Sequence, residues 1–127
     1  MTVLGIGIDV VENGRVAAAV ERHGSRFLER IFHPAEAAYC QSMQDPGPHL
    51  AARFAAKEAV AKAFGTGFAG PVSWRDIEIR RKASGEPFVV LHAGAADLAK
   101  RLGVHTVLIS LSHSQNYSVA NALLLTD

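Results

Sequence analysis

The segment LAARFAAKEAVAKAF, residues 50–64, decides the fold, because it is the strongest helical pattern in the chain. At 100° per residue, five small residues fall on one side of this helix: Ala52, Ala55, Ala56, Ala59 and Ala63. A side built from such small residues can pack very close to another element. Gly65 and Gly67 follow directly and end the helix. We therefore predict a helix over residues 50–64 with one closely packed face.

The opposite side of this helix carries charges where an amphipathic helix would have an apolar stripe. Apolar and charged residues are interleaved there: Leu50, Arg53, Phe54, Lys57, Glu58, Val60, Lys62 and Phe64. In one interpretation Glu58 and Lys62, spaced i to i+4, form a surface pair worth roughly 0.3–0.5 kcal/mol. Arg53 and Lys57 would then be solvated. In the other interpretation the charges belong to a functional site.

The N-terminal run over residues 3–11 is rich in β-branched residues and predicts a strand. Alternation places the larger apolar residues on one face and the rest on the other: Leu4, Ile6, Ile8 and Val10 against Gly5, Gly7 and Asp9. An acid on a face with no other side chains can reach a ligand that approaches the backbone closely. The alternative is that Asp9 caps the following turn.

A metal site is expected if Asp9 and Glu58 converge. Two adjacent carboxylates repel each other, and a bound divalent cation is the usual way to keep both ionised. Oxygen ligands without a Cys or His cluster favour Mg²⁺, completed by water and phosphate oxygens. Arg53 and Lys62 would suit those phosphates. GIGID lacks the third glycine of the dinucleotide fingerprint, and the chain has no P-loop pattern.

The motif SLSHS, residues 110–114, offers hydroxyls, backbone N–H groups and one imidazole at the end of a predicted strand. It could hold a phosphate, or its Ser and His side chains could simply satisfy a turn. No acid is placed by the sequence to orient His113, so a serine-hydrolase triad has little support. The other histidines show no ligand spacing: His23, His33, His49, His92 and His105.

The rest of the chain alternates helices, loops and strands. Asn13 is expected to cap the first helix, and Pro34 to lie in the first turn of the third. Helices are predicted over residues 14–23, 34–43 and 93–102, and a further helical stretch between the first two ends near residue 32. Loops are predicted over residues 44–49 and 65–73. Strands are predicted over 74–82 and 87–92, and over 105–114 and 117–126. This order predicts an α+β fold with a mainly antiparallel sheet.

Composition sets the class of protein. The chain has 127 residues, of which 49% are apolar, and we expect one domain over residues 1–127. A net charge of +1 gives no reason to expect a nucleic-acid partner, and the single cysteine, Cys40, excludes an internal disulfide. No basic segment precedes the first apolar run and Asp9 interrupts it, so we expect neither a signal peptide nor a membrane span, and a soluble, cytoplasmic protein.

Five motifs together resemble the bacterial holo-acyl-carrier-protein synthases, which are small phosphopantetheinyl transferases. The motifs are GIGID at 5–9, RFAAKEAxxKAFGTG at 53–67, WxDIEI at 74–79, GxP at 85–87 and SLSHS at 110–114. They occur in the family's order and approximate spacing, and the resemblance covers nearly the whole chain. It implies transfer of 4'-phosphopantetheine from coenzyme A to a serine of an acyl carrier protein.

The resemblance also implies roles for individual residues. Asp9 and Glu58 would hold Mg²⁺, and Lys62 would contact the transferred phosphate. Arg53 and His113, between Ser112 and Ser114, would hold the nucleotide and its phosphates. The coenzyme cleft would be lined by backbone at Gly65, Gly67, Gly85 and Pro87.

Partners follow from the same resemblance. Arg15 falls where the family has a basic residue that meets the carrier protein, and Arg22 or Arg26 could extend that patch, although a solvated helix face is the alternative. A homotrimer with clefts between adjacent subunits is implied. We expect Glu58 or a metal-bound water, rather than His113, to accept the serine proton. Two other functions remain open: a magnesium-dependent phosphohydrolase, and a non-catalytic module that binds coenzyme A or the carrier.

Overall fold

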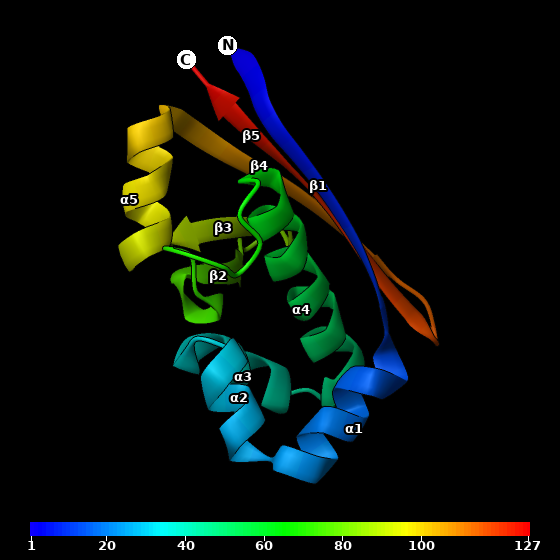
Figure 1. Ribbon diagram of the computed structural model, residues 1–127. Coiled ribbons are helices and arrows are strands. Elements are labelled where there is room, and N and C mark those ends of the chain that lie inside the picture. Colours follow the sequence, from blue (N-terminus) through cyan, green and yellow to red (C-terminus); the bar gives the residue numbers. More distant parts are fainter.

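A three-stranded sheet with the helix α4 packed across it forms the centre of the computed structural model, which describes residues 1–127 (Figure 1). In chain order the elements are β1 (Thr2–Glu12), α1 (Asn13–His23), α2 (Ser25–Ile31), α3 (Pro34–Gln41), α4 (Pro46–Ala63), the short 3₁₀ helix η1 (Trp74–Asp76), β2 (Ile77–Arg81), β3 (Pro87–Leu91), α5 (Ala93–Leu102), β4 (Val104–His113) and β5 (Tyr117–Thr126). The chain thus has the α+β composition that the sequence predicts.

All strand pairs are antiparallel, as predicted. The larger sheet has the order β1-β5-β4, so the last strand of the chain lies in the middle, between the first strand and β4. Asp9 on β1 and Leu111 on β4 both pair in register with Ala120 on β5. β2 and β3 form a separate two-stranded sheet. Both termini lie at the same end of the molecule (Figure 1).

Glycines on β1 allow α4 to lie against the sheet at backbone distance. A Cβ added to Gly5 would come within 2.1 Å of the Ala63 carbonyl oxygen, and one added to Gly7 within 1.9 Å of the Ala59 oxygen. Ala59 is fully buried, and Ala63 is 8% exposed. The close packing predicted for the alanine face of α4 is therefore confirmed, and the strand it meets is the one that carries Asp9.

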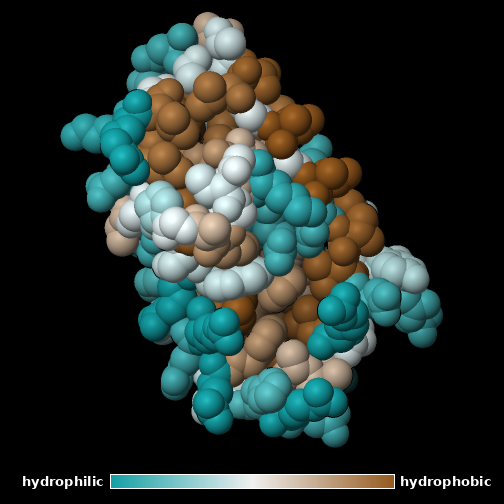
Figure 2. Space-filling model, in the orientation of Figure 1, coloured by the Kyte–Doolittle hydropathy of each residue, from teal (hydrophilic) through white to brown (hydrophobic).

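The opposite face of the large sheet is apolar and uncovered. Five large side chains on it are between 46% and 69% exposed: Leu4, Ile6, Ile8, Val10 and Leu108. Ile6 and Leu108 belong to one row, because both pair in register with Leu123. Figure 2 shows apolar residues gathered along the edge of the molecule formed by this sheet. No helix covers this face of the sheet. The larger apolar residues of β1 therefore point out of the molecule.

The helix α4 begins earlier than the sequence indicates. Residues 44–49 were expected to be a loop, but helix starts at Pro46, with Asp45 as its N-cap residue. The loop prediction is wrong for 46–49 because the first turn of a helix has N–H groups without intrahelical partners, and proline loses nothing there. His49 consequently lies on the helix.

Asn13 does not cap α1 as predicted. It is the first helical residue and is 7% exposed. Its side-chain amide donates to the carbonyl oxygens of Ser114 and Gln115, and its Oδ1 accepts from the Ser118 hydroxyl at 2.7 Å. These long-range bonds to the β4–β5 turn replace the local capping bond and fix the position at which the chain leaves β1.

The solvated interpretation of Arg53 and Lys57 is also wrong. Arg53 is 3% exposed and Lys57 is fully buried, because α3, η1 and β2 cover that side of α4. The structure contains no helix with both the length and the apolar character needed to cross a membrane.

Candidate active site

Asp9 and Lys62 meet where β1 crosses the second half of α4. Asp9 Oδ1 lies 3.0 Å from Lys62 Nζ, and that ammonium also donates to the Ile8 carbonyl oxygen at 3.1 Å. The Asp9 side chain is 14% exposed and that of Lys62 is 51% exposed. Lys62 therefore pairs with Asp9. The surface-pair interpretation, in which Lys62 pairs with Glu58, is wrong. Gly5 and Gly7, on the same face of β1 as Asp9, allow α4 to come this close.

Glu58 lies one turn before Lys62 and faces the same space. Burial and the negative charge of Asp9 raise the pKa of Glu58, and the positive charge of Lys62 opposes that rise. The two carboxylates thus lie close enough to repel. Oxygen ligands of this kind suit a hard divalent cation such as Mg²⁺, which would relieve the repulsion. The residues present fit such an ion.

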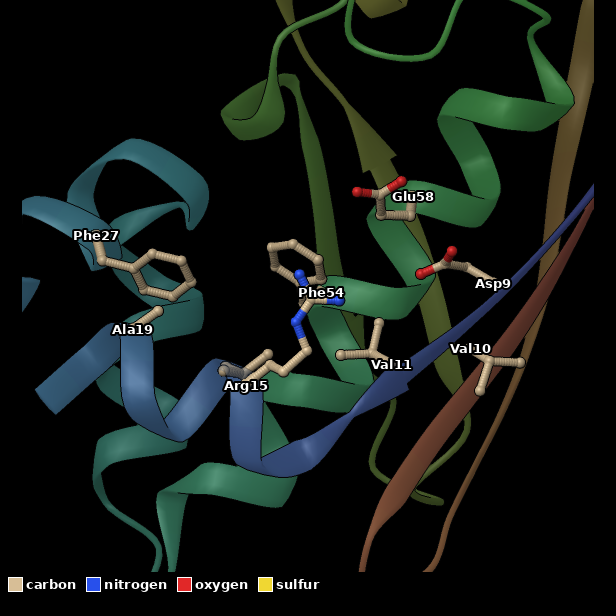
Figure 3. Close-up of a pocket in the computed structure, with 9 residues that line it drawn as sticks. Asp9, Val10, Val11, Arg15, Ala19, Phe27, Phe54 and Glu58 are labelled. Atoms are coloured by element: carbon tan, nitrogen blue, oxygen red, sulfur yellow. The ribbon is translucent and has the colours of Figure 1, made fainter. Parts of the chain in front are cut away.

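Both acids line one pocket of about 380 Å³, here called the acidic pocket. Its other lining residues come from the end of β1, from α1, α2 and α4: Val10, Val11, Arg15, Val16, Ala19, Phe27 and Phe54. Figure 3 shows Glu58 and Asp9 at one end, Phe27 at the other and the Arg15 side chain reaching in from α1. A charged end beside an apolar wall can receive a ligand that has both characters.

The arginines predicted to meet a carrier protein lie on α1 and α2. Arg15 is part of the acidic pocket, and it shares a shallow depression with Arg22 on the outer side of α1. Arg26, near the start of α2, is exposed. Arg15 is therefore the one of the three that the structure brings next to the acids.

Arg53 lies on a different side of α4. Its Nη1 is 3.5 Å from the Cys40 Sγ, and its guanidinium stacks over the Tyr39 ring at 4.5 Å. Five residues along a helix correspond to about 140° of rotation, so Arg53 and Glu58 cannot face one pocket. The expectation that Arg53 and Lys62 flank the same phosphates is not met within one chain.

His113 lies on the side of α4 that carries Arg53, not on the side that faces Asp9. Its ring lies 6.3 Å from that of His49 on α4. Burial lowers the pKa of His49, and the positive charges of Arg53, His113 and Arg81 lower it further. These four residues form a group of cationic side chains, here called the cationic cluster. A concentration of positive charge such as this suits phosphate groups.

His49 and Arg81 are the functional candidates that sequence reasoning missed. His49 falls in a predicted loop, and Arg81 lies between the WxDIEI and GxP motifs but belongs to neither. An earlier start for α4 would have put His49 one turn before Arg53 on the same face, which is the one signal that could have found it.

The remaining predicted residues lie around these two regions. Ser112 is exposed on β4, and Ser114 closes the β4–β5 turn, where its Oγ accepts from the Tyr117 N–H at 3.3 Å. Gly65 and Gly67 follow α4 with φ of 81° and 57°, a range that favours glycine. Gly85 has φ of 91° in the β2–β3 turn, close to Pro87 at the start of β3.

A family model described as "4'-phosphopantetheinyl transferase superfamily" matches residues 5–122. The chain belongs to this superfamily. Among curated relatives of this transferase, the holo-[acyl-carrier-protein] synthase of Koribacter versatilis is 48% identical over 122 residues, which cover 96% of this chain and 98% of that protein. The synthase of Moorella thermoacetica is 52% identical over 120 residues, covering 94% and 92%.

Solved structures agree with the fold of this transferase. The Neisseria meningitidis holo-[acyl-carrier-protein] synthase superposes with a TM-score of 0.92 at 34% identity, covering 98% of this chain and all of that one. The Helicobacter pylori enzyme in complex with coenzyme A gives 0.85 at 29% identity, covering 94% and 99%. The resemblance read from the five sequence motifs is thereby confirmed.

Proposed function

We propose that this chain is a holo-[acyl-carrier-protein] synthase, a transferase domain over residues 1–127 that moves 4'-phosphopantetheine from coenzyme A to a serine of apo acyl carrier protein. Adenosine 3',5'-bisphosphate is the second product. The observation that carries this proposal is the convergence of Asp9 and Glu58 at one end of the acidic pocket, with Lys62 paired to Asp9 beside it. That convergence occurs in a chain that is 48% and 52% identical to enzymes of this name.

In the reaction, the carrier serine oxygen bonds to the β-phosphorus of coenzyme A as the pyrophosphate bond breaks. Asp9 and Glu58 would hold Mg²⁺, which supplies positive charge to the pyrophosphate when bound. Lys62, hydrogen-bonded to Asp9, adds a positive charge at the transferred phosphate. The serine proton passes to Glu58 through a water molecule, because a carboxylate that holds a cation is a poor base by direct contact, and the bisphosphate leaves as an anion.

The cationic cluster is proposed to bind the nucleotide part of coenzyme A. Its members Arg53 and Arg81 offer charged N–H donors for phosphate oxygens, and the imidazoles of His49 and His113 offer further N–H donors. Arg53 is held in place by Tyr39 and Cys40, and its Nε has no partner within the chain. A buried donor without a partner suits a ligand oxygen. The glycine turns at Gly65, Gly67 and Gly85, with Pro87, are proposed to line the cleft.

A homotrimer would allow the two regions to act together. Within one chain the acidic pocket and the cationic cluster lie on different sides of α4, so an active site that uses both needs a second subunit. The uncovered apolar face of the β1-β5-β4 sheet supports self-association, since large contiguous apolar patches are rarely left exposed. The threefold symmetry rests on the family resemblance.

The carrier protein is proposed to approach over α1. Arg15 reaches from this helix into the acidic pocket, so an acidic surface bound to Arg15, Arg22 and Arg26 would lie beside Asp9 and Glu58. A cytoplasmic location completes the proposal. The buried, unpaired Cys40 thiol is consistent with a reducing compartment.

The intact mass of apo acyl carrier protein, incubated with this protein, coenzyme A and Mg²⁺, tests the proposal. The carrier is expected to gain the mass of one phosphopantetheine. The Asp9→Ala variant is expected to abolish this gain. The Asp97→Ala variant, which changes an exposed residue of α5, should modify the carrier as the wild type does. An unchanged carrier with hydrolysed coenzyme A would identify a phosphohydrolase instead. Bound coenzyme A with no reaction would identify a binding module.

A further inference from the structure

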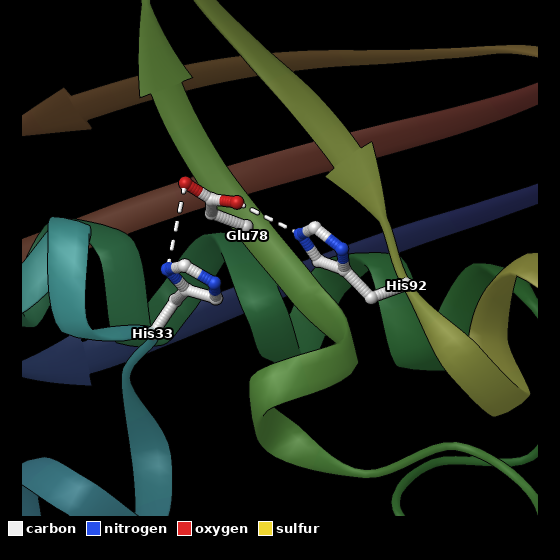
Figure 4. Close-up of side chains that lie close together, drawn as sticks. All are labelled: His33, Glu78 and His92. Atoms are coloured by element: carbon white, nitrogen blue, oxygen red, sulfur yellow. Dashed lines mark hydrogen bonds and ion pairs between the residues drawn. The ribbon is translucent and has the colours of Figure 1, made fainter.

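Two histidines and a glutamate converge in a place that the proposed reaction does not use. His33 precedes α3, Glu78 lies on β2, and His92 precedes α5 (Figure 4). His92 Nε2 is 2.8 Å from Glu78 Oε1, and His33 Nδ1 is 3.8 Å from Glu78 Oε2. The two imidazoles stack at 5.3 Å with an angle of 13° between their planes. The sequence shows no ligand spacing here, because the three residues come from three separate elements.

The ligand atoms of this group are nearly in place for one metal ion. The two ring nitrogens and a carboxylate oxygen all lie within 4.8 Å of one another. Two ligands of a tetrahedral zinc ion lie about 3.4 Å apart, since each bond is about 2.1 Å long. The imidazoles of His33 and His92 are 34% and 37% exposed, so these rings have room to rotate and bring their nitrogens onto one ion. The same exposure gives an ion a path to the site.

The nitrogen of His33 is available as a ligand. His33 Nδ1 accepts a weak hydrogen bond from the Ala35 N–H at 3.4 Å, so this atom carries a lone pair rather than a proton. A metal ion that takes that lone pair would remove this one weak bond at the start of α3, whereas the other capping bond remains, in which the Glu36 carboxylate accepts from the His33 N–H at 2.9 Å.

Arg80 binds the Glu78 carboxylate and would compete with a metal ion for it. Its Nε and Nη2 donate to the two Glu78 oxygens at 2.7 and 3.1 Å. Glu78 is fully buried, whereas the Arg80 side chain is 49% exposed. A buried carboxylate needs a positive charge beside it, and either the guanidinium or a metal ion can supply that charge. Arg80 can turn into solvent when an ion takes its place.

We propose that His33, Glu78 and His92 form a binding site for a divalent transition-metal ion, with Zn²⁺ as the best fit. Imidazole nitrogens select Zn²⁺ or Co²⁺ over Mg²⁺, whereas the all-oxygen pair Asp9 and Glu58 has the opposite preference. Three protein ligands leave one position for water. The ion links the starts of α3 and α5 to β2, so its binding stabilises the folded chain.

Titration with Co²⁺, followed by its visible absorption, tests the site in the full-length protein with excess Mg²⁺ present to occupy Asp9 and Glu58. His92→Gln and His33→Asn are expected to weaken Co²⁺ binding at least about tenfold. His49→Gln and His105→Gln, which change histidines outside the site, should leave it unchanged. Equal binding by the wild type, His92→Gln and His33→Asn would overturn the proposal, as would no cobalt spectrum at any concentration.

The Arg80→Met variant tests the role of Glu78 separately. Removal of the competing guanidinium is expected to tighten Co²⁺ binding several-fold, in a protein whose circular dichroism confirms that it is folded. Unchanged or weaker binding would overturn the assignment of Glu78 as a ligand. Zn²⁺ should also raise the melting temperature of the wild type but not that of His92→Gln. An equal rise in both proteins would contradict the site.

Discussion

Lys57 and Glu36 form an ion pair in the interior, with Nζ 2.6 Å from Oε1 and neither side chain more than 1% exposed. Lys57 also donates to the carbonyl oxygens of Trp74 and Ile77, and Glu36 Oε2 accepts from the Ile79 N–H at 2.9 Å. Burial lowers the pKa of Lys57, and the adjacent Glu36 charge opposes this. The pair joins α3, α4 and β2, and so holds together the region that contains Arg53.

We predict that Lys57→Met destabilises the protein by about 3–5 kcal/mol, because Glu36 is then left as a buried charge without a partner. The midpoint of urea unfolding, followed by circular dichroism, measures the change. Lys82→Met is the matched control, since Lys82 pairs with Glu86 at 3.2 Å in solvent. The control should change stability by less than about 1 kcal/mol. Equal effects in the two variants would show that the buried pair has no special role.

Gly7→Ala is expected to destabilise the protein by about 1–3 kcal/mol or more and to lower transferase activity. The added methyl would lie 1.9 Å from the Ala59 carbonyl oxygen, so α4 must move away from β1 and carry Lys62 away from Asp9. Gly14→Ala is the control, because a Cβ there meets nothing within 4 Å. Thermal unfolding and carrier modification measure the two effects. A neutral Gly7→Ala would contradict the close contact.

Glu58→Gln is expected to lower kcat by about 10²–10⁴, as loss of a general base does. His113→Ala should mainly raise the KM for coenzyme A, because His113 belongs to the cationic cluster. Turnover measured against pH in both variants separates these roles. If only the histidine variant loses the alkaline plateau of activity, His113 is the proton acceptor and our assignment is wrong.

Ile6→Glu is expected to convert a trimer into monomers, because Ile6 is 69% exposed on the uncovered sheet face. Sedimentation equilibrium measures the mass, and transferase activity should fall with the loss of trimer. Leu102→Glu is the control, since Leu102 is 41% exposed on α5, away from that face. A wild-type protein that is monomeric at all concentrations would refute self-association through the sheet.

Cys40 is expected to make stability depend on alkaline pH. Burial raises the pKa of this thiol above its ordinary value of 9.0, and the Arg53 charge opposes the rise. The unfolded thiol therefore ionises first, so the contribution is complete below pH 9 and is lost as pH rises toward the folded-state pKa. The free energy of unfolding of the wild type should fall more steeply above pH 9 than that of Cys40→Ala. Parallel curves would show that the thiol does not contribute.

Local pattern was enough to predict the parts of the molecule that depend on neighbours in sequence. The alanine face of α4 predicted a close packing of this helix, and alternation separated the glycines of β1 from its larger residues, because side-chain size along one element is a local property. The strand pairs that follow α4 were predicted for the same reason. The partner expected at the glycine face was a ligand, whereas α4 itself packs against Gly5 and Gly7. The motif that contains Asp9 and the one that contains Glu58 and Lys62 then identified the family.

The sequence by itself therefore determined most of the elements, the family, and Asp9, Glu58 and Lys62 as candidate site residues. Tertiary structure alone decided that Lys62 pairs with Asp9, that Arg53 joins His49 and His113, and that His33 meets His92 at a buried carboxylate. Helical periodicity assigns a residue to a face, but it does not say which distant segment covers that face. These contacts join residues far apart in the chain, so they exist only once packing has brought their elements together.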